Sequence, residues 1–440
     1  MHFFIGLLVI FLSIAASAER ILTLKGSNTI GEDLAPSLAK AYLEKKGLQQ
    51  ITMNQSSTHH TAIITGIVNP FSSTPTKMEI AIEAHGSSTG FKALINNQTD
   101  IVMSSRRIKD KEVIALSQLG DMKKTSTEQT IGIDGLSIVT HPDKPIHRLT
   151  LNQIRQIFAG QVTHWDAVGG LKRPITLYAR DAQSGTWDTF KKMVLGQSLT
   201  LADHAERFES NTVLAEQVMH DLNAIGFVGL AAIGETNVLA IGEEGIDALK
   251  PGKFEVATED YPLARRLYLY VPENTDNPIA KEFIEFSQSA EGQEIVGAVG
   301  FVSQNIQKAS IDKQSKMPVY YQELTDSAER LSINFRFAEG SPSLDTKASR
   351  DIQRLVQYLI DKKKLTGKIY LVGFSNATKS YSEDVVLSRF RALAVRRELL
   401  KQGVIIADSR GLGSFMPVAS ETNTFKNDRV EVWIDKNEEG

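Results

Sequence analysis

Three short turns rich in Gly, Ser and Thr each lead directly into a helix-like pattern. They lie at Gly26–Gly31, Gly86–Gly90 and Ser184–Thr186. The first amides of a helix have no intrahelical acceptor, so together with nearby hydroxyl groups they can bind an oxyanion without a lysine. The third turn follows Arg180, whose guanidinium can add a charge-assisted contact. If the chain brings the three turns together, they form a site for a small tetrahedral oxyanion.

The size and charge of the chain narrow the classes of protein to consider. At 440 residues it is too long for one ordinary hydrophobic core, so we expect several compact units. Its 49 Lys and Arg residues nearly balance 52 Asp and Glu residues, which gives a formal net charge of −3. A chain without a basic field does not attract polyanions, so no nucleic-acid partner is expected.

Residues 1–18 are predicted to be a secretory signal peptide. The apolar run at 3–14 is too short to span a bilayer, and Ala16-Ser17-Ala18 offers the small residues of a cleavage site. An uncleaved anchor is the alternative, because this segment lacks Lys and Arg. The sequence has no cysteine, which excludes disulfides, thiolate metal sites and a lipid anchor on an N-terminal cysteine.

Strands and helices are predicted to alternate through the first two thirds of the chain. Thr150 and Gln153 form a capping box at the start of one helix, which stops at Gly160. The polar segment 54–77, rich in Ser and Thr, is interpreted as an inserted loop. The predicted strands are 21–24, 78–84, 101–103, 131–140 and 175–178, and the predicted helices begin at Leu34, Phe91, Leu151, Trp187 and Pro278.

This alternation favours α/β lobes with largely parallel sheets, whose ligands bind beyond the carboxyl ends of the strands. The polar stretch 303–327 lacks a long periodic face and is interpreted as a linker. From Ile333 onward a new strand and helix pattern predicts a small βαβαβ sandwich. The expected units are therefore two lobes at 19–305, a linker at 306–330 and a C-terminal sandwich at 331–440.

Residues 20 to about 305 resemble the periplasmic phosphate-binding proteins that feed phosphate ABC transporters. The resemblance implies a two-lobed, type 2 periplasmic-binding-protein fold that closes on phosphate in the cleft between its lobes. It is carried by separated blocks in the family's order: GSNTIG, GSSTGFKALINNQTDIVMSSR, LTLNQIRQIFAGQVTHWDAVGG, ARDAQSGTWDTF, AIGFVG, YPLARRLYLYV and SAEGQEIVGAVGFV.

The same resemblance implies which residues hold the anion. Hydroxyl groups from all three turns and the backbone amides of Ile30, Gly185 and Thr186 would donate to it, and one guanidinium would add a bidentate charged pair. The implied residues are Thr29 and Ile30 in the first turn, Ser87 in the second, and Arg180, Ser184, Gly185 and Thr186 in the third.

The sequence departs from the family at Ser105, where the best-known members carry an acidic residue that accepts the proton of bound phosphate. Asp134 and Asp181 are the candidates to replace that carboxylate, and Arg106 is a candidate second cation. Sulfate does not carry the proton that such a carboxylate would accept. A receptor for another oxyanion, such as sulfate, molybdate or arsenate, therefore stays open as an alternative.

Two enzymatic interpretations find little support in the sequence. Ser184 lacks the G-x-S-x-G context of a nucleophile and has no placed histidine partner. His59, His60 and His85 could suggest a metal site, but adjacent histidines in a polar loop lack the i, i+4 spacing of helical ligands. We therefore expect no enzyme, no metal and no cofactor.

From about residue 331 the chain resembles the OmpA-like peptidoglycan-binding domain. The matching blocks are NFRFAEGSPSLD, IYLVGFSNA, LSRFRALAVRRELLKQGV, GLGSFMPVA and NDRVEVWI. In that family an Asp and an Arg grip the charged ends of diaminopimelate, and the resemblance matches that Arg to Arg391. The family's Asp is replaced by Asn376, which supplies no charge but is expected to accept from an ammonium through its side-chain oxygen. Arg429 matches the family's terminal arginine and is expected to support the same peptidoglycan pocket.

Together these resemblances imply a receptor in the periplasm of a Gram-negative cell. It would bind inorganic phosphate, pass it to an ABC permease in the inner membrane, and be held to peptidoglycan by its C-terminal module. A surface or adhesive protein that reuses the scaffold without transport is the alternative of a different class.

Overall fold

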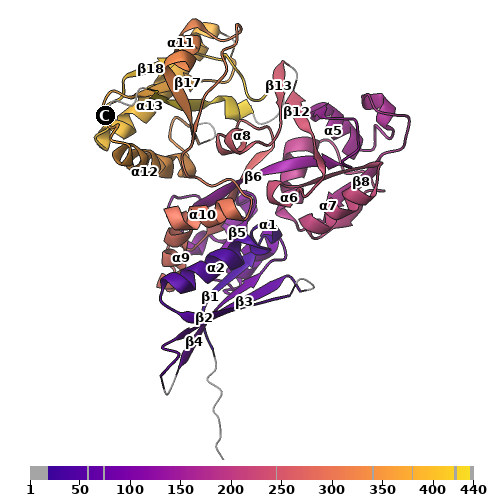
Figure 1. Ribbon diagram of the computed structural model, residues 1–440, viewed down its shortest axis with the longest axis vertical. Coiled ribbons are helices and arrows are strands. Elements are labelled where there is room, and N and C mark those ends of the chain that lie inside the picture. Colours follow the sequence, from indigo (N-terminus) through magenta and orange to yellow (C-terminus); the bar gives the residue numbers. More distant parts are fainter. Residues whose placement is uncertain are drawn as a thin grey trace, which may run out of the picture.

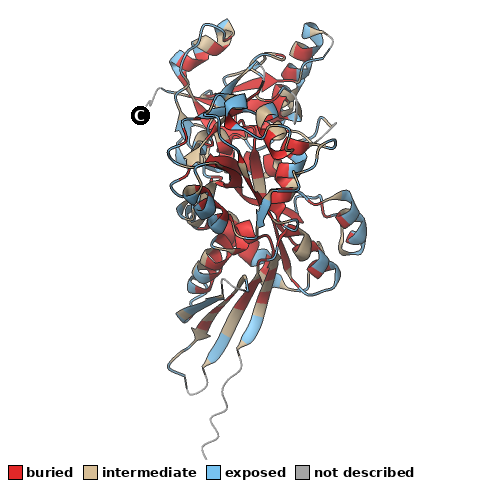
Figure 2. Ribbon diagram, turned by 90° about the vertical axis from the view of Figure 1, so that its right-hand side faces the viewer, coloured by how far each residue is buried: buried red, intermediate tan, exposed pale blue. Residues whose placement is uncertain are grey.

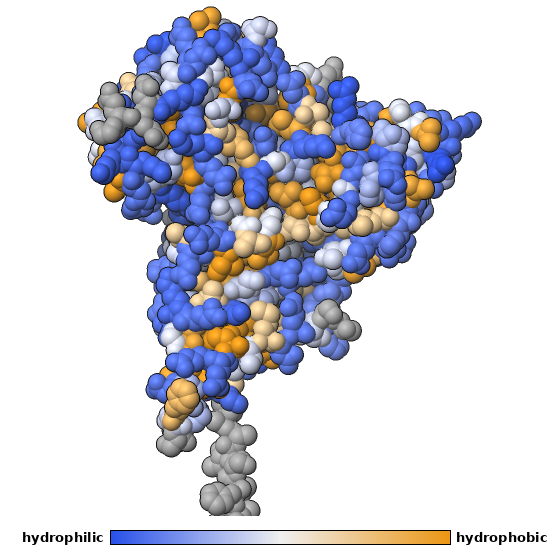
Figure 3. Space-filling model, viewed as in Figure 1, coloured by the Kyte–Doolittle hydropathy of each residue, from blue (hydrophilic) through white to orange (hydrophobic). Residues whose placement is uncertain are grey.

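A computed structural model describes residues 18–56, 59–72, 75–243, 245–338, 341–378, 380–420 and 424–436. Apart from Ala18, the predicted signal peptide lies outside these residues. Figure 1 shows three bodies: a lower lobe, a lobe to its right and a C-terminal domain above. Within the described ranges, every helix is too short or too polar to cross a membrane. The face seen in Figure 3 is largely hydrophilic, whereas Figure 2 places the buried residues inside the bodies.

The first lobe is a mixed sheet with helices on both faces. Alternate residues of its strands face opposite sides, so Ile101 packs with α2, α9 and α10 while Val102 packs with α3. Its strands are β1 (Glu19–Gly26), β2 (Gln49–Ser56), β3 (Thr61–Val68), β4 (Thr76–Glu83), β5 (Ile101–Ser104) and β14 (Ala264–Tyr270). Its main helices are α2 (Leu34–Lys45), α3 (Ser87–Ile95), α4 (Asp110–Ala115), α9 (Pro278–Gln288) and α10 (Ala290–Ala298).

The loop predicted at 54–77 is wrong, because this segment holds the end of β2, all of β3 and the start of β4. The three strands pair in antiparallel order and extend the sheet at one edge. Ala62 and Ile64 are buried while their neighbours are only partly so, which is the period of a half-buried strand. The Ser- and Thr-rich flanks concealed this short apolar alternation.

One strand, β6 (Glu128–Thr140), belongs to both lobes. Its first half pairs with β14 of the first lobe, and its second half pairs with β10 (Ala224–Gly229) of the second lobe. The segment just before β14 runs beside it as the other crossing connection. The lobes are therefore joined by two adjacent stretches of chain, as the two-lobed fold requires.

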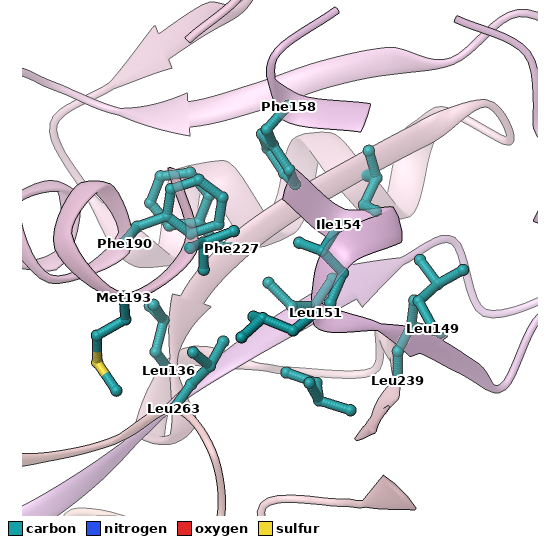
Figure 4. Close-up of a cluster of buried hydrophobic side chains, with 14 of the residues drawn as sticks. Leu136, Leu149, Leu151, Ile154, Phe158, Phe190, Met193, Phe227, Leu239 and Leu263 are labelled. Atoms are coloured by element: carbon teal, nitrogen blue, oxygen red, sulfur yellow. The ribbon is translucent and has the colours of Figure 1, made fainter. Parts of the chain in front are cut away.

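The second lobe packs its helices around an aromatic core. The rings of Phe190 and Phe227 stack with centroids 3.9 Å apart, and Phe158 meets both edge-on (Figure 4). Its helices are α5 (Leu151–Phe158), α6 (Gly185–Phe190) and α7 (Asn211–His220), with α8 (Lys253–Ala257) near the crossing. Its strands are β8 (Thr176–Arg180), β9 (Glu206–Phe208), β10 and β11 (Asn237–Val238), with a small second sheet of β7 (Arg148–Thr150), β12 (Ala240–Glu243) and β13 (Ile246–Leu249).

The C-terminal domain is the predicted α/β sandwich with three added elements, which are two strands and a helix. Helices α12 (Thr346–Asp361) and α13 (Tyr381–Lys401) pack on one face of its sheet, and α11 (Val319–Ser327) packs on the other. The strands, in spatial order, are β15 (Lys308–Ala309), β16 (Ala328–Arg336), β19 (Arg429–Asp435), β17 (Ile369–Phe374) and β18 (Asp408–Gly411).

The stretch interpreted as a linker needs correction, because it contains both β15 and α11. Tyr321 and Leu324 of α11 are buried against Trp433. The hydroxyl of Tyr321 donates to Glu431 at 2.9 Å. This segment therefore contributes to the core of the C-terminal domain. Its helix has only nine residues, so its apolar face is too short to stand out among the polar residues around it.

The C-terminal domain is docked on the crossing between the lobes. Arg330 donates to Asp260 at 2.7 Å, and Arg336 lies 3.3 Å from the same carboxylate. Burial alone would raise the pKa of Asp260, but the cations around it, Arg330 above all, hold that pKa below its ordinary value. The ammonium of Lys426 donates to the carbonyl groups of Tyr261 and Pro262, both at 3.0 Å.

Contacts with both lobes surround this buried centre. Thr346 donates to Glu128 at the start of β6, at 2.7 Å. The backbone and hydroxyl of Ser420 donate to Glu243 of the second lobe. The C-terminal domain thus spans the junction rather than trailing from it.

Replacing Asp260 by Ala should lower the free energy of unfolding by about 3–5 kcal/mol, because Arg330 and Arg336 would stay buried without their carboxylate. Urea denaturation measures this change. Asp247→Ala is the matched control. It removes an ion pair with Lys316 at the surface, where the side chain of Asp247 is 70% exposed and that of Lys316 is 60% exposed. The control should cost at most about 1 kcal/mol. Equal losses for the two variants would contradict the buried-network account.

Candidate functional site

The three turns converge between the lobes. The first is now α1 (Asn28–Gly31), which follows β1, and the hydroxyls of Thr29 and Thr186 lie 3.1 Å apart across the interlobe boundary. The second turn also meets the third, because Gly86 has φ +108° and no room for a Cβ atom against the carbonyl of Gln183. Segments far apart in the chain therefore lie side by side here, as the sequence analysis predicted, and the binding role of these turns stays a prediction.

Hydroxyl groups of the first lobe line this meeting point. The amide of Ser105 donates to the hydroxyl of Ser87 at 3.1 Å, and Ser27 donates to the hydroxyl of Ser105 at 3.2 Å. Gly185 of the second lobe has no space for a Cβ atom, because the hydroxyls of Ser87 and Ser105 lie against it. Ser27 was not predicted, although it lies within the first turn.

Arg180 is the cation of the site and is fully buried at the end of β8. Its Nε donates to the carbonyl of Phe208 at 3.1 Å and its Nη2 to the carbonyl of Glu209. Its Nη1 has no hydrogen-bond partner in the described part of the chain. Burial lowers the pKa of Arg180 to about 10, so the side chain is still charged at neutral pH. A buried, under-compensated cation is stabilised by an anionic partner.

The third turn supplies a capped helix start. The hydroxyl oxygen of Ser184 accepts from the amides of Thr186 at 3.1 Å and Trp187 at 3.4 Å. The expectation that the Thr186 amide donates to an anion therefore needs correction. The Ser184 hydroxyl, which accepts here, still has a proton to donate, whereas the hydroxyls of Thr186 and Thr29, 3.1 Å apart, use one of their two protons on each other. Ile30 and Gly185 lie in the first turns of α1 and α6, where amides lack intrahelical acceptors.

Arg106 does not act as the second cation that the sequence suggested. Its guanidinium binds Glu112 at 2.7 Å and Asp188 of the second lobe at 2.9 Å. Burial lowers its pKa, but these two carboxylates outweigh that effect and raise it overall. Lys109 also reaches Asp188, at 2.7 Å. Arg106 is thus neutralised and ties the two lobes together.

Asp134 is likewise already paired. One of its oxygens accepts from Arg265 at 2.6 and 3.0 Å, and the other accepts from the amide of Leu230 at 2.7 Å. Asp181 differs, because its Oδ1 accepts from Gln183 while its buried Oδ2 has no partner among the described residues. That oxygen lies 4.0 Å from Arg180. Of the two carboxylates proposed from the sequence, only Asp181 has a buried oxygen to spare.

Arg265 was missed, although it lies within the block YPLARRLYLYV. It is nearly buried, its Nη1 has no partner in the described ranges, and its charge acts on Arg180. The sequence showed two adjacent arginines there without indicating which one faces inward. Arg266 instead binds Glu259 at 2.6 Å and Asp345 at 2.8 Å.

Two glutamates at the mouth of the site were also missed. Glu32 accepts from Ser210 across the lobes at 3.1 Å, and burial raises its pKa. Glu209 lies 3.3 Å from His60 and 3.8 Å from His85. These histidines were considered for a metal site, but the described residues hold no group of three or more side chains placed to bind a metal ion.

In the C-terminal domain, Arg391 and Asn376 come together while Arg429 points elsewhere. Arg391 binds Asp428 at 2.7 Å, and the backbone N–H of Asn376 donates to the same carboxylate at 2.7 Å. Arg429 is 2% exposed, binds Glu431 at 2.9 Å and lies over the ring of Phe374 at 3.9 Å. Arg429 therefore belongs to the buried network, and its expected place in a surface pocket needs correction.

Comparison with known proteins agrees with this architecture. Residues 40–291 match the PBP superfamily domain and residues 336–429 match the OmpA family. The phosphate-binding protein PstS of Pseudomonas aeruginosa is 29% identical over 242 residues, which cover 51% of this chain and 74% of that protein. PstS of Bacillus subtilis is 25% identical over 288 residues, which cover 65% and 91%.

A solved structure gives the same picture. The putative phosphate ABC transporter substrate-binding protein of Clostridium perfringens, with bound phosphate, is 26% identical and superposes with a TM-score of 0.50. The match covers 64% of this chain and 98% of that one. The family is one of binding proteins rather than enzymes. On its sequence match and its two-lobed fold, the chain belongs to the PBP superfamily, with a PstS-like domain followed by a C-terminal OmpA-family domain.

Proposed function

We propose that this protein binds inorganic phosphate between its two lobes for delivery to an ABC permease, and that its C-terminal domain attaches it to peptidoglycan in the periplasm. The observation that carries the first part is Arg180, a buried guanidinium at the meeting point of three hydroxyl-rich turns, whose Nη1 has no hydrogen-bond partner within the described part of the chain. The relatives named for phosphate binding and the phosphate-bound Clostridium structure support the same ligand.

Phosphate would be held by neutral donors around one charge. The hydroxyls of Thr29, Ser87, Ser184 and Thr186, the amides of Ile30 and Gly185, and the guanidinium of Arg180 make up the proposed set. The backbone amide of Ser105 donates to the hydroxyl of Ser87, and the hydroxyls of both residues lie against Gly185. Micromolar binding corresponds to about 8 kcal/mol, which several charge-assisted hydrogen bonds can supply.

Asp181 is the proposed acceptor for the proton that phosphate carries and sulfate lacks. Its Oδ2 is buried and unpartnered within the described ranges, and no other candidate carboxylate of the site has such an oxygen among those residues. A carboxylate facing the anion repels a fully deprotonated ligand but accepts a hydrogen bond from a protonated one. This assignment replaces Asp134, whose oxygens are taken by Arg265 and Leu230.

Binding would favour the closed arrangement of the lobes, because the ligand contacts turns from both. Arg106 with Asp188, and Glu32 with Ser210, already cross the boundary and would stabilise the closed form. The permease would then recognise that form. In the C-terminal domain, Arg391 is the proposed contact to the wall peptide.

Arg180→Ala should weaken phosphate binding by about 2–5 kcal/mol, or roughly 30-fold to several thousandfold in Kd, because the bound anion loses its cation. Isothermal titration calorimetry measures the Kd. Arg148→Ala, at an exposed position of β7, serves as the control and should leave the Kd unchanged. An unchanged Kd in Arg180→Ala would contradict the proposed site.

Asp181→Asn should reduce the preference for phosphate over sulfate by about tenfold or more, because removing the carboxylate removes its repulsion of sulfate. Titrations of both variant and wild type with phosphate, sulfate, arsenate and molybdate test this ratio. Asp143→Asn, whose carboxylate is 83% exposed, is the control. Sulfate binding as tight as phosphate in the wild type would overturn the assignment of phosphate.

Arg391→Ala should abolish retention on purified sacculi, because the carboxylate of Asp428 would remain beside Asn376 without its cationic partner. Co-sedimentation with sacculi measures retention. The control is Arg397→Ala on the same helix, whose side chain is 72% exposed and should not affect retention. Equal retention of Arg391→Ala and wild type would remove Arg391 from the wall contact.

A further inference from the structure

The pocket around Arg391 contains a carboxylate at a position that the sequence comparison did not indicate. Asp428 lies between Asn427 and the start of β19, and its side chain is 27% exposed. One of its oxygens lies 2.7 Å from Nη2 of Arg391, and the other accepts from the backbone amide of Asn376. Asp428 therefore lies beside position 376, where the resemblance expects an acid and this chain has an amide.

Arg391 retains an unused donor at this place. Its Nη1 is buried and has no hydrogen-bond partner within the described ranges, and its guanidinium lies 5.6 Å from the ring centre of Phe337. Burial lowers the pKa of Arg391 despite the nearby Asp428. A partly desolvated guanidinium with a free Nη1 can still bind a carboxylate.

The other polar groups nearby are committed to the fold. Asp384 accepts from the amide of Thr378 and the hydroxyl of Ser414, and it is nearly buried. The side-chain oxygen of Asn376 accepts from Asn427 at 3.3 Å. Glu431 is buried with Arg429. These contacts leave Asp428 as the partly exposed carboxylate in contact with Arg391.

We propose that Asp428, and not position 376, supplies the negative charge of the wall-binding pocket, and that Asp428 and Arg391 together bind a zwitterionic centre with an ammonium and a carboxylate on one carbon. This proposal rests on the proposed attachment to peptidoglycan. The ammonium of the ligand donates to Asp428, and its carboxylate accepts from the guanidinium of Arg391, whose side chain is 18% exposed. In this proposal the acid of the pocket is Asp428, just before β19, instead of a residue at position 376, just after β17.

The existing ion pair makes the pocket selective for a ligand with both charges. A ligand with only a carboxylate meets an arginine that Asp428 already neutralises, and a ligand with only an amine meets a carboxylate that Arg391 already neutralises. A zwitterion satisfies both partners without leaving a net charge in the partly buried pocket. Removing the charge of Asp428 should therefore invert the preference, since Arg391 would then favour simple carboxylates.

The test is co-sedimentation of the full chain with diaminopimelate-type sacculi, in competition with free diaminopimelate, cadaverine or glutarate. Asp428→Asn should reduce retention about tenfold or more, while its amide oxygen can still accept from the amide of Asn376. Asp428→Glu should keep the charge and retain binding. The matched control is Asp408→Asn, which removes the carboxylate of another Asp–Arg pair, with Arg410 at 2.9 Å, in the same domain. Its retention should equal that of wild type.

Competition gives a second measurement that a purely structural role would not change. Diaminopimelate should displace wild type, and cadaverine and glutarate should not, whereas glutarate should compete against any residual binding of Asp428→Asn. If Asp428→Asn is retained like wild type while Arg391→Ala is lost, the role of Asp428 is overturned and wall attachment stands. Displacement of wild type by glutarate as strongly as by diaminopimelate would overturn the zwitterion claim. If wild type itself is not retained, wall attachment fails and this proposal fails with it.

Discussion

The carboxylate of Asp260, held between Arg330 and Arg336, is the interaction on which the arrangement of the three bodies depends. It lies just before β14, where the chain returns from the second lobe to the first, and its partners lie on strand β16 of the C-terminal domain. Lys426 adds two hydrogen bonds to the same stretch. Because these charges are buried, neither side tolerates separation from the other. The C-terminal domain is therefore tied to the crossing segment just before β14.

Two buried arginines show how partners determine the role of a charge. Arg106 and Arg180 are both nearly inaccessible, and both lie where the lobes meet. Arg106 is surrounded by Glu112 and Asp188, so its charge is satisfied and it serves to hold the lobes together. Arg180 donates to two backbone carbonyls, and its Nη1 has no hydrogen-bond partner among the residues that the structure describes. The first is a structural tie, and the second is suited to bind an anion.

The sequence predicted the parts of this protein whose signals are local. The strand before each turn, the capping box at Thr150, and the strand and helix order of the C-terminal domain all depend on neighbours a few residues apart. The sequence analysis missed two elements. The strand β3 has eight residues but lies between polar flanks, and the nine-residue helix α11 buries only Tyr321, Leu324 and Thr325. Both elements are stabilised by distant partners, β4 for the strand and Trp433 for the helix. A single sequence does not display such partners.

The sequence by itself indicated the family, the fold and the three hydroxyl-rich turns that meet between the lobes, because several separated blocks occur in the order of one family. Only the tertiary structure decided which charged residues are free to act. Arg106 is neutralised by an aspartate 82 positions away, and Asp134 by an arginine 131 positions away. Likewise, Asp428 lies beside Arg391 only because β19 returns next to β17. Charge pairing depends on distances of a few ångströms in space, and separation along the chain does not reveal them.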